Sequence, residues 1–418
     1  MKRPGTKKLA IDGGRKVRES PWPARRLLGE EEKRAVIALL DKAMASSDVC
    51  GYNGEQEEAY CNQFARSLGG GYADAVNSGT SAVYVALRAL EIEPFTEVIV
   101  PPITDPGGVM PVPLMNCVPV PADAAPGSYN AGPEQVRDRI TRQTSAILVA
   151  HIAGIPCDMD GIMDVARSAG LPVIEDCAQA HGALYRGRAV GTIGDVAAFS
   201  TMFGKHHATG GQGGVVFTKD EHLYWRAKRL ADRGKPFGLE GVTSNIVASL
   251  NLNSSELAMA LGREQLKKLP GMVEARRRVA LSIAAQCESL RTVRMVSDPP
   301  ECKASFWFLF FRVDLARIRV GKEQFVAALA AEGLPVGASY LHTPVLADWY
   351  RNRAVFGTSG YPWACPLYKG DRNKQYELPN AMATDACHFT MNIHEGCGEQ
   401  EVADTIAALR KVEAAYAS

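Results

Sequence analysis

The sequence has no long apolar run: no stretch of its 418 residues approaches 18 uninterrupted apolar residues, and no apolar segment follows the basic residues at its start. This pattern predicts neither a membrane span nor a secretion signal, so we expect a cytoplasmic protein. None of the ten cysteines forms a C-x-x-C pair. Their scatter indicates reduced, mostly packed thiols and argues against a disulfide framework or a zinc site.

An excess of charge of one sign is missing as well. The 47 Lys and Arg residues nearly cancel the 46 Asp and Glu residues, and no run of like charge exceeds a few residues. This balance of charge gives no electrostatic reason to expect binding to nucleic acid or to a membrane surface. We expect small or weakly charged partners instead.

The order of short apolar runs and helical stretches predicts an α/β fold. Several of the apolar runs are separated by helical patterns, which is typical of a largely parallel, buried sheet. An outer amphipathic helix is expected over 29–44. The apolar runs cover 98–101, 146–151, 171–176, 196–200 and 213–218.

A Pro-Gly pair at Pro270 and Gly271 predicts the end of a helix, and we place a domain boundary there. Residues 1–270 are expected to form a large domain with an N-terminal segment, and residues 271–418 a smaller α+β domain. The expected elements of the smaller domain are a strand within 305–314 and helices over 322–331 and 399–416.

The segment Asn77-Ser78-Gly79-Thr80-Ser81 directly precedes a helical run. Small residues at a helix start leave backbone N–H groups and hydroxyls free to bind an anion. An ordinary Ser or Thr cap has the same pattern, so this short motif does not decide between the two readings.

Asp176 follows the apolar run 171–174, at the carboxyl end of a predicted buried strand. Ligands bind at this edge of open parallel sheets. A carboxylate there is costly to bury unless it meets a cation or hydrogen-bond donors, so either a positively charged ligand or a helix-capping role explains it.

Lys205 lies five residues after Ser200, in the stretch FSTMFGKHHATGGQGG. A lysine beside the carboxyl edge of a sheet can have a lowered amine pKa and form a Schiff base with a carbonyl, although most lysines are solvated surface residues. An anion cradle, a buried carboxylate and a reactive lysine together match the phosphate, the ring nitrogen and the aldehyde of pyridoxal 5'-phosphate (PLP).

A longer ordered series of motifs covers nearly the whole chain. It includes LAIDGG at 9–14, NSGTSA at 77–82, TRQTSAILVAHIAG at 141–154, VIEDCAQAHGALYRGRAVGTIGDVAAFS at 173–200, GQGG at 211–214 and SLNLNSSELAMALGREQL at 249–266. This series resembles the DegT/DnrJ/EryC1/StrS sugar aminotransferases. The resemblance implies the aspartate aminotransferase-like fold type I of PLP-dependent transferases, with a mostly parallel mixed sheet in the large domain.

The resemblance also assigns roles to individual residues. Lys205 would bond the cofactor aldehyde, Asp176 would keep the ring nitrogen protonated, and Gln179 would lie against the ring or its hydroxyl. Asn251 would reach the phosphate of the neighbouring subunit, which implies an obligate homodimer with shared active sites. The residues implied to hold the phosphate are Gly79, Thr80, Ser81 and Ser200.

The implied activity is amino transfer. Glutamate or glutamine would donate the amino group to PLP, which cycles through pyridoxamine 5'-phosphate, and a keto-sugar or an inosose-type keto-cyclitol would accept it. Two alternatives remain, a keto-deoxysugar dehydratase and a non-catalytic homologue that binds PLP or a sugar. The dehydratases of this fold have His in place of the lysine, and the register after Ser200 favours Lys205 over His206.

Two positions depart from the family pattern. Asp105 stands where an aromatic residue usually stacks on the cofactor ring, so either another side chain covers that face or Asp105 contacts substrate hydroxyls, unless it is a plain turn residue before Pro106. Asn253 stands where many members have an arginine. The candidates for substrate binding are His206, Tyr340 and His342, with packing or loop capping as the alternative for each.

Overall fold

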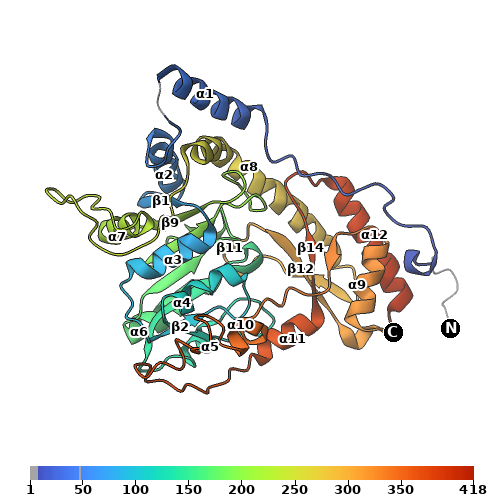
Figure 1. The fold of residues 1–418 in the computed structure, drawn as a ribbon. Helices are drawn as coiled ribbons and strands as arrows, with labels where there is room; N and C mark the ends of the chain where they lie inside the picture. The colour runs from blue at the N-terminus through green and yellow to red at the C-terminus, as the bar shows by residue number, and fades with distance from the viewer. Residues whose placement is uncertain (1–7, 47–48) are drawn as a thin grey trace.

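A seven-stranded sheet forms the centre of the larger part of the molecule (Figure 1). The computed structural model describes residues 8–46 and 49–418. The start of the chain, for which no secretion signal is predicted, therefore lies partly outside the described residues. Only β9 runs antiparallel to the other six strands. The strand order is β1 (Tyr72–Val76), β9 (Gly214–Thr218), β8 (Val196–Ser200), β5 (Val173–Asp176), β4 (Thr144–Ala150), β2 (Glu97–Val100) and β3 (Val118–Pro121).

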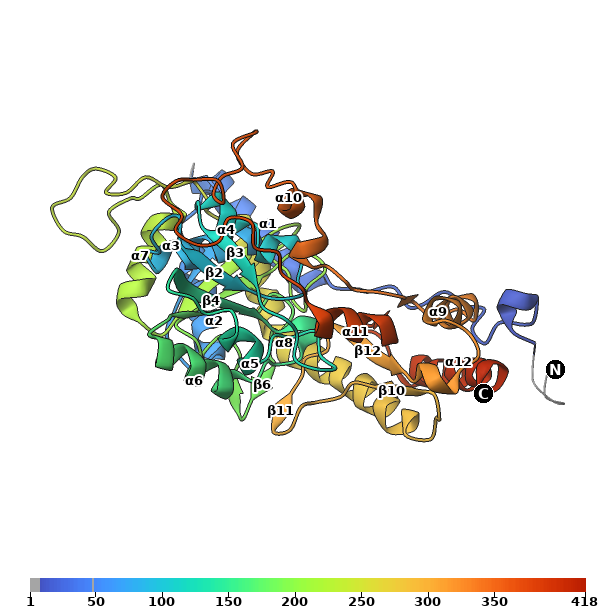
Figure 2. The same ribbon diagram turned by 90° about the horizontal axis from the view of Figure 1, so that it is seen from below.

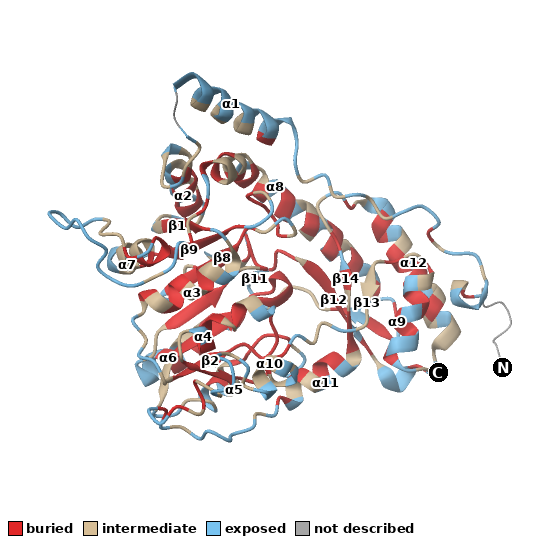
Figure 3. Cartoon of the chain, viewed as in Figure 1, coloured by how far each residue is buried: buried red, intermediate tan, exposed pale blue. Residues whose placement is uncertain are grey.

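Both faces of this sheet are covered by helices, which confirms the predicted α/β class. Alternate strand residues pack on opposite faces: Ile147 and Val149 lie in one apolar cluster, and Ala146 and Leu148 in the other. Figure 3 shows the buried sheet between the exposed outer faces of the helices. One face carries α3 (Gly79–Ala89), α4 (Pro111–Leu114) and α7 (Glu221–Ala231), and the other α2 (Glu55–Ser67), α5 (Pro133–Arg137) and α6 (Met159–Ala169).

The predicted end of a helix at Pro270 is wrong, because α8 (Glu256–Cys287) continues through this proline without a break. A proline inside a helix removes one backbone hydrogen bond and costs about 3 kcal/mol. Buried side chains on both sides of it, including Leu269, Met272 and Val273, pack against the rest of the molecule and offset that cost. The boundary between 1–270 and 271–418 remains a prediction, and it would fall inside one helix.

The C-terminal part contains a second sheet, which is antiparallel and lies beside the large one (Figure 2). The predicted strand within 305–314 and both predicted helices are present. The strand order is β10 (Val293–Met295), β12 (Phe308–Val313), β14 (His388–Asn392) and β13 (Val336–Gly337), and the helices are α9 (Lys322–Ala331), α10 (Asp348–Arg351), α11 (Pro379–Cys387) and α12 (Glu399–Tyr416). A small third sheet consists of β6 (Leu184–Tyr185), β7 (Arg188–Ala189) and β11 (Cys302–Lys303).

Helix α1 (Glu30–Ser46) stands away from the body of the molecule, as does the loop after α7 (Figure 1). Glu32 is the one buried residue of α1. Large apolar side chains are exposed on both segments: Ile37, Leu40 and Met44 on α1, and Leu239, Val242, Ile246, Val247 and Leu250 on the loop. None of the helices in the described residues combines the length and the apolar character that a membrane span requires.

Candidate active site

A cavity of about 240 Å³ lies at the carboxyl edge of the large sheet. The last residues of β4, β5 and β8, which are Ala150, Asp176 and Ser200, line it. Parallel strands bring the residues that follow them to one edge, so motifs far apart in the sequence meet here. The predicted site residues around this cavity are Gly79, Thr80, Asp176, Gln179, Ser200 and Lys205.

The N-terminus of α3 forms one wall. Ser78 caps the helix, since its hydroxyl accepts a hydrogen bond of 3.1 Å from the backbone N–H of Ser81. The Ser81 hydroxyl bonds to the Asn77 side chain at 2.6 Å, and Ser81 is not among the lining residues. A Cβ at Gly79 would lie 2.6 Å from Cβ of Ser200, so glycine allows the helix start and Ser200 to approach closely. Helix N-termini of this kind favour anions.

The Asp176 carboxylate is buried in the cavity wall without a cationic partner within ion-pair distance in the described residues. One oxygen accepts a hydrogen bond from the Ala178 N–H at 3.0 Å. Burial raises the pKa of this carboxyl group, and the Ala178 hydrogen bond and the charge of Lys205 oppose the rise. A ligand with a positively charged group would compensate the burial of this carboxylate.

Lys205 lines the same cavity and is buried, with 6% of its surface exposed. Its Nζ lies 3.9 Å from the centre of the Trp307 ring. No hydrogen bond or ion pair to Nζ is found among the described residues. Burial lowers the pKa of the Lys205 amine, while the charges of Asp176 and Asp105 oppose this effect. The neutral amine is the form that can attack a carbonyl.

Gln179 and Tyr340 connect the cavity to the C-terminal part. The Gln179 side chain accepts a hydrogen bond from the Ala153 N–H at 2.8 Å and donates one to the Tyr340 hydroxyl at 2.8 Å. His342 is exposed and stacks edge-on against Tyr340. His206 is fully buried, bonds through Nε2 to the Ser305 carbonyl at 3.1 Å, and does not line the cavity.

Asp105 adopts the turn geometry that was one of its expected alternatives. Its carboxylate accepts a hydrogen bond from the Gly107 N–H at 2.9 Å and caps a short 3-10 helix, Pro106–Gly108. It nevertheless lines the cavity. At Gly108, a Cβ would lie 2.7 Å from an Asp176 carboxylate oxygen, so the backbone of this turn passes directly over Asp176.

His151 lines the cavity and was missed by the sequence interpretation. Its Nδ1 accepts a hydrogen bond from the Cys157 N–H at 3.0 Å, so Nε2 carries the proton and donates to Glu175 at 3.1 Å. Glu175 also accepts three backbone N–H bonds, from Gly191, Ile193 and Gly194. The sequence contained a signal for His151, because this residue directly follows β4, just as Cys177 directly follows β5, and residues at these positions lie at the carboxyl edge of the sheet.

A cluster of buried histidines lies behind Ser200. His181 bonds to the Ser200 carbonyl at 2.8 Å and packs edge-on against His207 at 4.7 Å between ring centres. His207 bonds to the Tyr60 hydroxyl at 2.9 Å. Burial lowers the pKa of His181 to about 4, and it also lowers the pKa of His206 and His207 well below the ordinary value.

These histidines are expected to make the protein sensitive to acid. The unfolded chain binds a proton at His181 below pH 6.5, whereas the folded protein does so only near pH 4, so stability falls as the pH decreases between these values. His181 alone should contribute a loss of about 3 kcal/mol between pH 7 and pH 4. Urea unfolding of the cofactor-free protein at several pH values measures this loss. The His181→Gln variant should lose less stability over the same range, and equal losses in both proteins would contradict the prediction.

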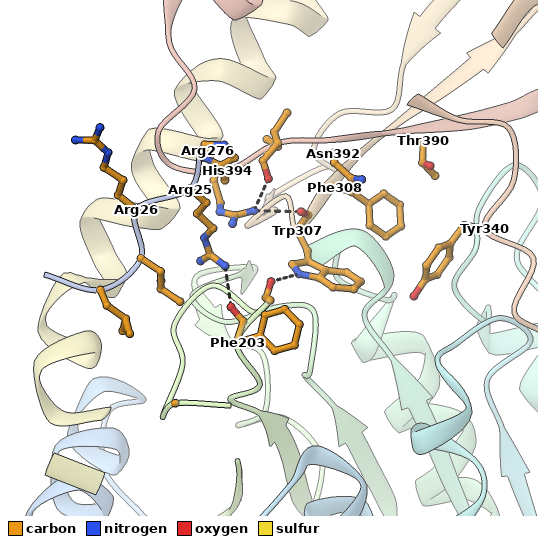
Figure 4. Close-up of a pocket in the computed structure, with 15 residues that line it drawn as sticks. Arg25, Arg26, Phe203, Arg276, Trp307, Phe308, Tyr340, Thr390, Asn392 and His394 are labelled. Carbon is orange, nitrogen blue, oxygen red and sulfur yellow. Dashed lines mark hydrogen bonds between the residues drawn. The ribbon is translucent and has the colours of Figure 1, made fainter. Parts of the chain in front are cut away.

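A second, larger cavity of about 810 Å³ is shown in Figure 4, and Trp307 in its wall contacts Lys205 of the first cavity. Trp307, Phe308 and Tyr340 line one side, and Arg25 and Arg26 lie on the other. Arg25 and the buried Arg276 both bind Glu395, so this single carboxylate compensates one of their two positive charges. Arg26 is exposed and has no side-chain partner among the described residues. This cavity offers an aromatic wall with one free cationic group at its rim.

The comparisons with known proteins agree with this geometry. The model of the DegT/DnrJ/EryC1/StrS aminotransferase family matches residues 28–362. The chain belongs to this family. An L-glutamine:2-deoxy-scyllo-inosose aminotransferase from Streptomyces lividus is 32% identical over 427 residues, which cover 97% of this chain and 97% of that protein. GDP-perosamine synthase from Escherichia coli O157:H7 is 30% identical, over 79% of this chain and 88% of its own.

Two solved structures have the same fold. An aminotransferase from Psychrobacter cryohalolentis superimposes with a TM-score of 0.78 at 29% identity, covering 93% of this chain and 97% of that chain. DesV from S. venezuelae gives a TM-score of 0.78 at 27% identity, covering 92% and 94%. The family and these neighbours are PLP-dependent aminotransferases, so the predicted family, fold and enzyme class are confirmed.

Asn251, the family's expected contact to the neighbouring subunit, lies outside both cavities in the single chain. It is exposed, and its side-chain oxygen accepts a hydrogen bond of 2.7 Å from the Asn253 amide. Asn253 in turn accepts a hydrogen bond from Asn53 at 3.1 Å. Asn53 also donates a hydrogen bond to the Asp232 carboxylate, so Asn253 belongs to a polar network that holds the Asn251 side chain.

Proposed function

We propose that this aminotransferase moves an amino group from glutamine or glutamate to a keto-cyclitol or keto-sugar, with PLP bound in the 240 Å³ cavity. The observation that carries the proposal is that a buried carboxylate, Asp176, and a buried amine, Lys205, line one cavity without ion-pair partners. PLP has a basic ring nitrogen for the first group and an aldehyde for the second. Its phosphate suits the start of α3 and Ser200.

PLP, when bound, withdraws electrons from the α-carbon of the amino donor and thereby makes its proton acidic. The residues of the chain have separate tasks. Asp176 holds a proton on the ring nitrogen by its negative charge. Lys205, with its amine free and neutral, would take the proton from the α-carbon of the donor and, as the ammonium, would give it back to the carbon on the other side of the donor nitrogen. The lowered pKa of Lys205 favours this neutral form.

Six other residues bind or enclose these groups. The oxygen and the nitrogen of the Gln179 side-chain amide are both hydrogen-bonded, which holds this amide in place at the cavity wall. Thr80 and Ser200 supply hydroxyl groups beside the helix N-terminus. Trp307, Phe308 and Tyr340 form an apolar and aromatic wall that limits the access of water to Lys205.

The choice of substrates rests on the relatives. The names of several of them give L-glutamine as donor and an inosose as acceptor, at about 30% identity over most of the chain. Another relative of similar identity, GDP-perosamine synthase, is named after a sugar product. The relatives that match over 97% of this chain support a keto-cyclitol acceptor most strongly.

A two-step assay tests this function. The PLP-loaded protein is first mixed with L-glutamine or L-glutamate, and the visible absorbance should shift within one turnover as the amino group moves to the cofactor. The isolated product enzyme is then mixed with 2-deoxy-scyllo-inosose or with a nucleotide-linked 4-keto-sugar, and mass spectrometry identifies the amine. An enzyme that reacts with neither donor, or with neither acceptor class, would contradict the proposal.

The functional unit in this proposal is a homodimer with shared active sites. The exposed apolar side chains of α1 and of the loop 237–250 would be covered by a second copy, because exposed apolar surface of this kind marks interfaces. Asn251 follows this loop and would donate its amide to the phosphate in the partner's cavity.

Mixed dimers test this arrangement. An inactive Lys205→Ala chain is combined with a chain inactivated by Asn251→Trp, whose bulk would block the partner's phosphate site. In the heterodimer both lesions fall in one composite site, so the other site is intact and up to half of the wild-type activity per dimer should return. Heterodimers that form without recovering activity would show that Asn251 does not act across the interface.

A further inference from the structure

Trp307 stands between the two cavities. Trp307 lines the 810 Å³ cavity (Figure 4), and Lys205, which contacts its ring, lines the 240 Å³ cavity. The distance from Lys205 Nζ to the ring centre is 3.9 Å, which is well within the range of a cation–π contact. Since no oxygen bonds to Nζ among the described residues, the face of this indole is the group that the amine contacts most closely.

The Trp307 ring is held in place from several directions. Its indole N–H donates to the Gly204 carbonyl at 2.9 Å, on the residue before Lys205. Its backbone N–H donates to the Ala153 carbonyl at 2.9 Å, and its own carbonyl accepts from the buried Arg276 at 3.1 Å. Because its indole edge and its backbone are both hydrogen-bonded, the orientation of the ring is fixed, and one of its faces meets the Lys205 amine.

The Lys205 loop is fixed as well. Arg25 donates a hydrogen bond of 2.7 Å to the Lys205 carbonyl and is itself bound to Glu395 at 2.8 Å. The backbone on both sides of the contact is thus anchored, and the amine is left to move between the Trp307 face and the centre of the smaller cavity.

We propose that Trp307 is a positioning residue for Lys205: in the cofactor-free protein, the aromatic face of Trp307 holds the protonated form of the lysine amine. The proposal rests on the proposed function in that Lys205 is the lysine that reacts with PLP. In the cofactor-free protein, the ring stabilises the charged amine at the edge of the site and keeps it from pairing with Asp176. The amine then stays at the wall of the 240 Å³ cavity, where the aldehyde of PLP would reach it.

Four titratable or charged groups lie near Lys205. The carboxylates of Asp176, at the end of β5, and of Asp105, before the short 3-10 helix, favour the ammonium. The other two are the buried His181, whose pKa is lowered to about 4, and Arg25, which binds the Lys205 carbonyl. Replacing the indole by an aliphatic side chain of similar burial leaves all four in place. It removes the negative face of the aromatic ring and the indole hydrogen bond to the Gly204 carbonyl, and since Trp307→Phe loses the same hydrogen bond, the difference between the Leu and Phe variants isolates the effect of the ring.

The test measures the protonation of Lys205 in the cofactor-free protein. Competitive labelling with acetic anhydride between pH 6 and pH 11, followed by mass spectrometry of the Lys205 peptide, gives the pKa of this amine without any turnover. We expect the pKa to fall by about one pH unit in Trp307→Leu and by less in Trp307→Phe, because benzene has the weaker face. Phe308→Leu, which removes a neighbouring aromatic ring from the same wall, is the matched control and should leave the pKa unchanged.

Equal pKa values in wild type, Trp307→Phe and Trp307→Leu would overturn the proposal, as would an equal shift in Phe308→Leu. If Trp307→Leu fails to fold by circular dichroism, the comparison of wild type with Trp307→Phe decides, and an unchanged pKa there would overturn the proposal too. The proposed function fails in a different way, through absent reaction with amino donors in the PLP-loaded wild type, so the two failures are distinguishable.

Discussion

Lys205→Ala is expected to lower the rate of amino transfer by at least about 10³-fold, because this variant loses both the group that bonds the cofactor and the group that moves the proton. The long-wavelength absorbance of cofactor bound through a lysine should disappear from the purified protein at the same time. The folded structure should persist, since the buried amine has no hydrogen-bond or ion-pair partner that the substitution would strand. Stopped-flow absorbance with excess L-glutamine measures the first half of the reaction.

Two control variants separate chemistry from charge. Lys205→Arg keeps a cation in the loop and should be as inactive as the alanine variant. Lys219→Ala removes an exposed lysine after β9 and should behave as wild type. Turnover by Lys205→Ala at the wild-type rate would transfer the catalytic role to another residue, and His206 would be the next to replace.

Asp176→Asn is expected to slow proton removal from the donor by about 10²- to 10⁴-fold, because the amide cannot hold the ring nitrogen in its protonated form. The cofactor-free variant should nevertheless be at least as stable as wild type. Burial raises the pKa of Asp176 in the empty cavity, so removing this ionisable group relieves a cost of burial. Urea unfolding and single-turnover kinetics on the same preparations measure the two opposite effects.

Asp105→Asn is the matched comparison. Asp105 lines the same cavity, but its carboxylate accepts a hydrogen bond from the Gly107 N–H within its own turn. An asparagine can accept the same hydrogen bond, and we expect a loss of activity below about tenfold. If Asp176→Asn retained full activity with bound cofactor, the proposed role of the Asp176 charge would be abandoned.

The sequence predicted the centre of the site well, because one physical rule places it. Asp176 and Lys205 each follow an apolar run, and the carboxyl ends of neighbouring parallel strands must meet at one edge. The predicted strands at 98–101, 146–151, 171–176, 196–200 and 213–218 are all present within a few residues.

Other parts depended on contacts that no local pattern encodes. Trp307 lies in the run SFWFLFF, which reads as ordinary core, and its place beside Lys205 follows from hydrogen bonds to residues more than 100 positions away. The Gln179 to Tyr340 bond crosses from one sheet to the other in the same way. The helix through Pro270 was missed because burial on both sides outweighs the local penalty of a proline.

The uninterrupted course of α8 determines how the molecule can be taken apart. A fragment that stops at residue 270 keeps half of a 32-residue helix and loses Met272, Val273 and Ile283, which cover apolar surface on its neighbours. A fragment that starts at residue 271 would begin in mid-helix, with unbonded backbone N–H groups where a helical turn should precede it. We therefore expect neither half to be soluble alone, because both parts of the molecule depend on the helix that they share.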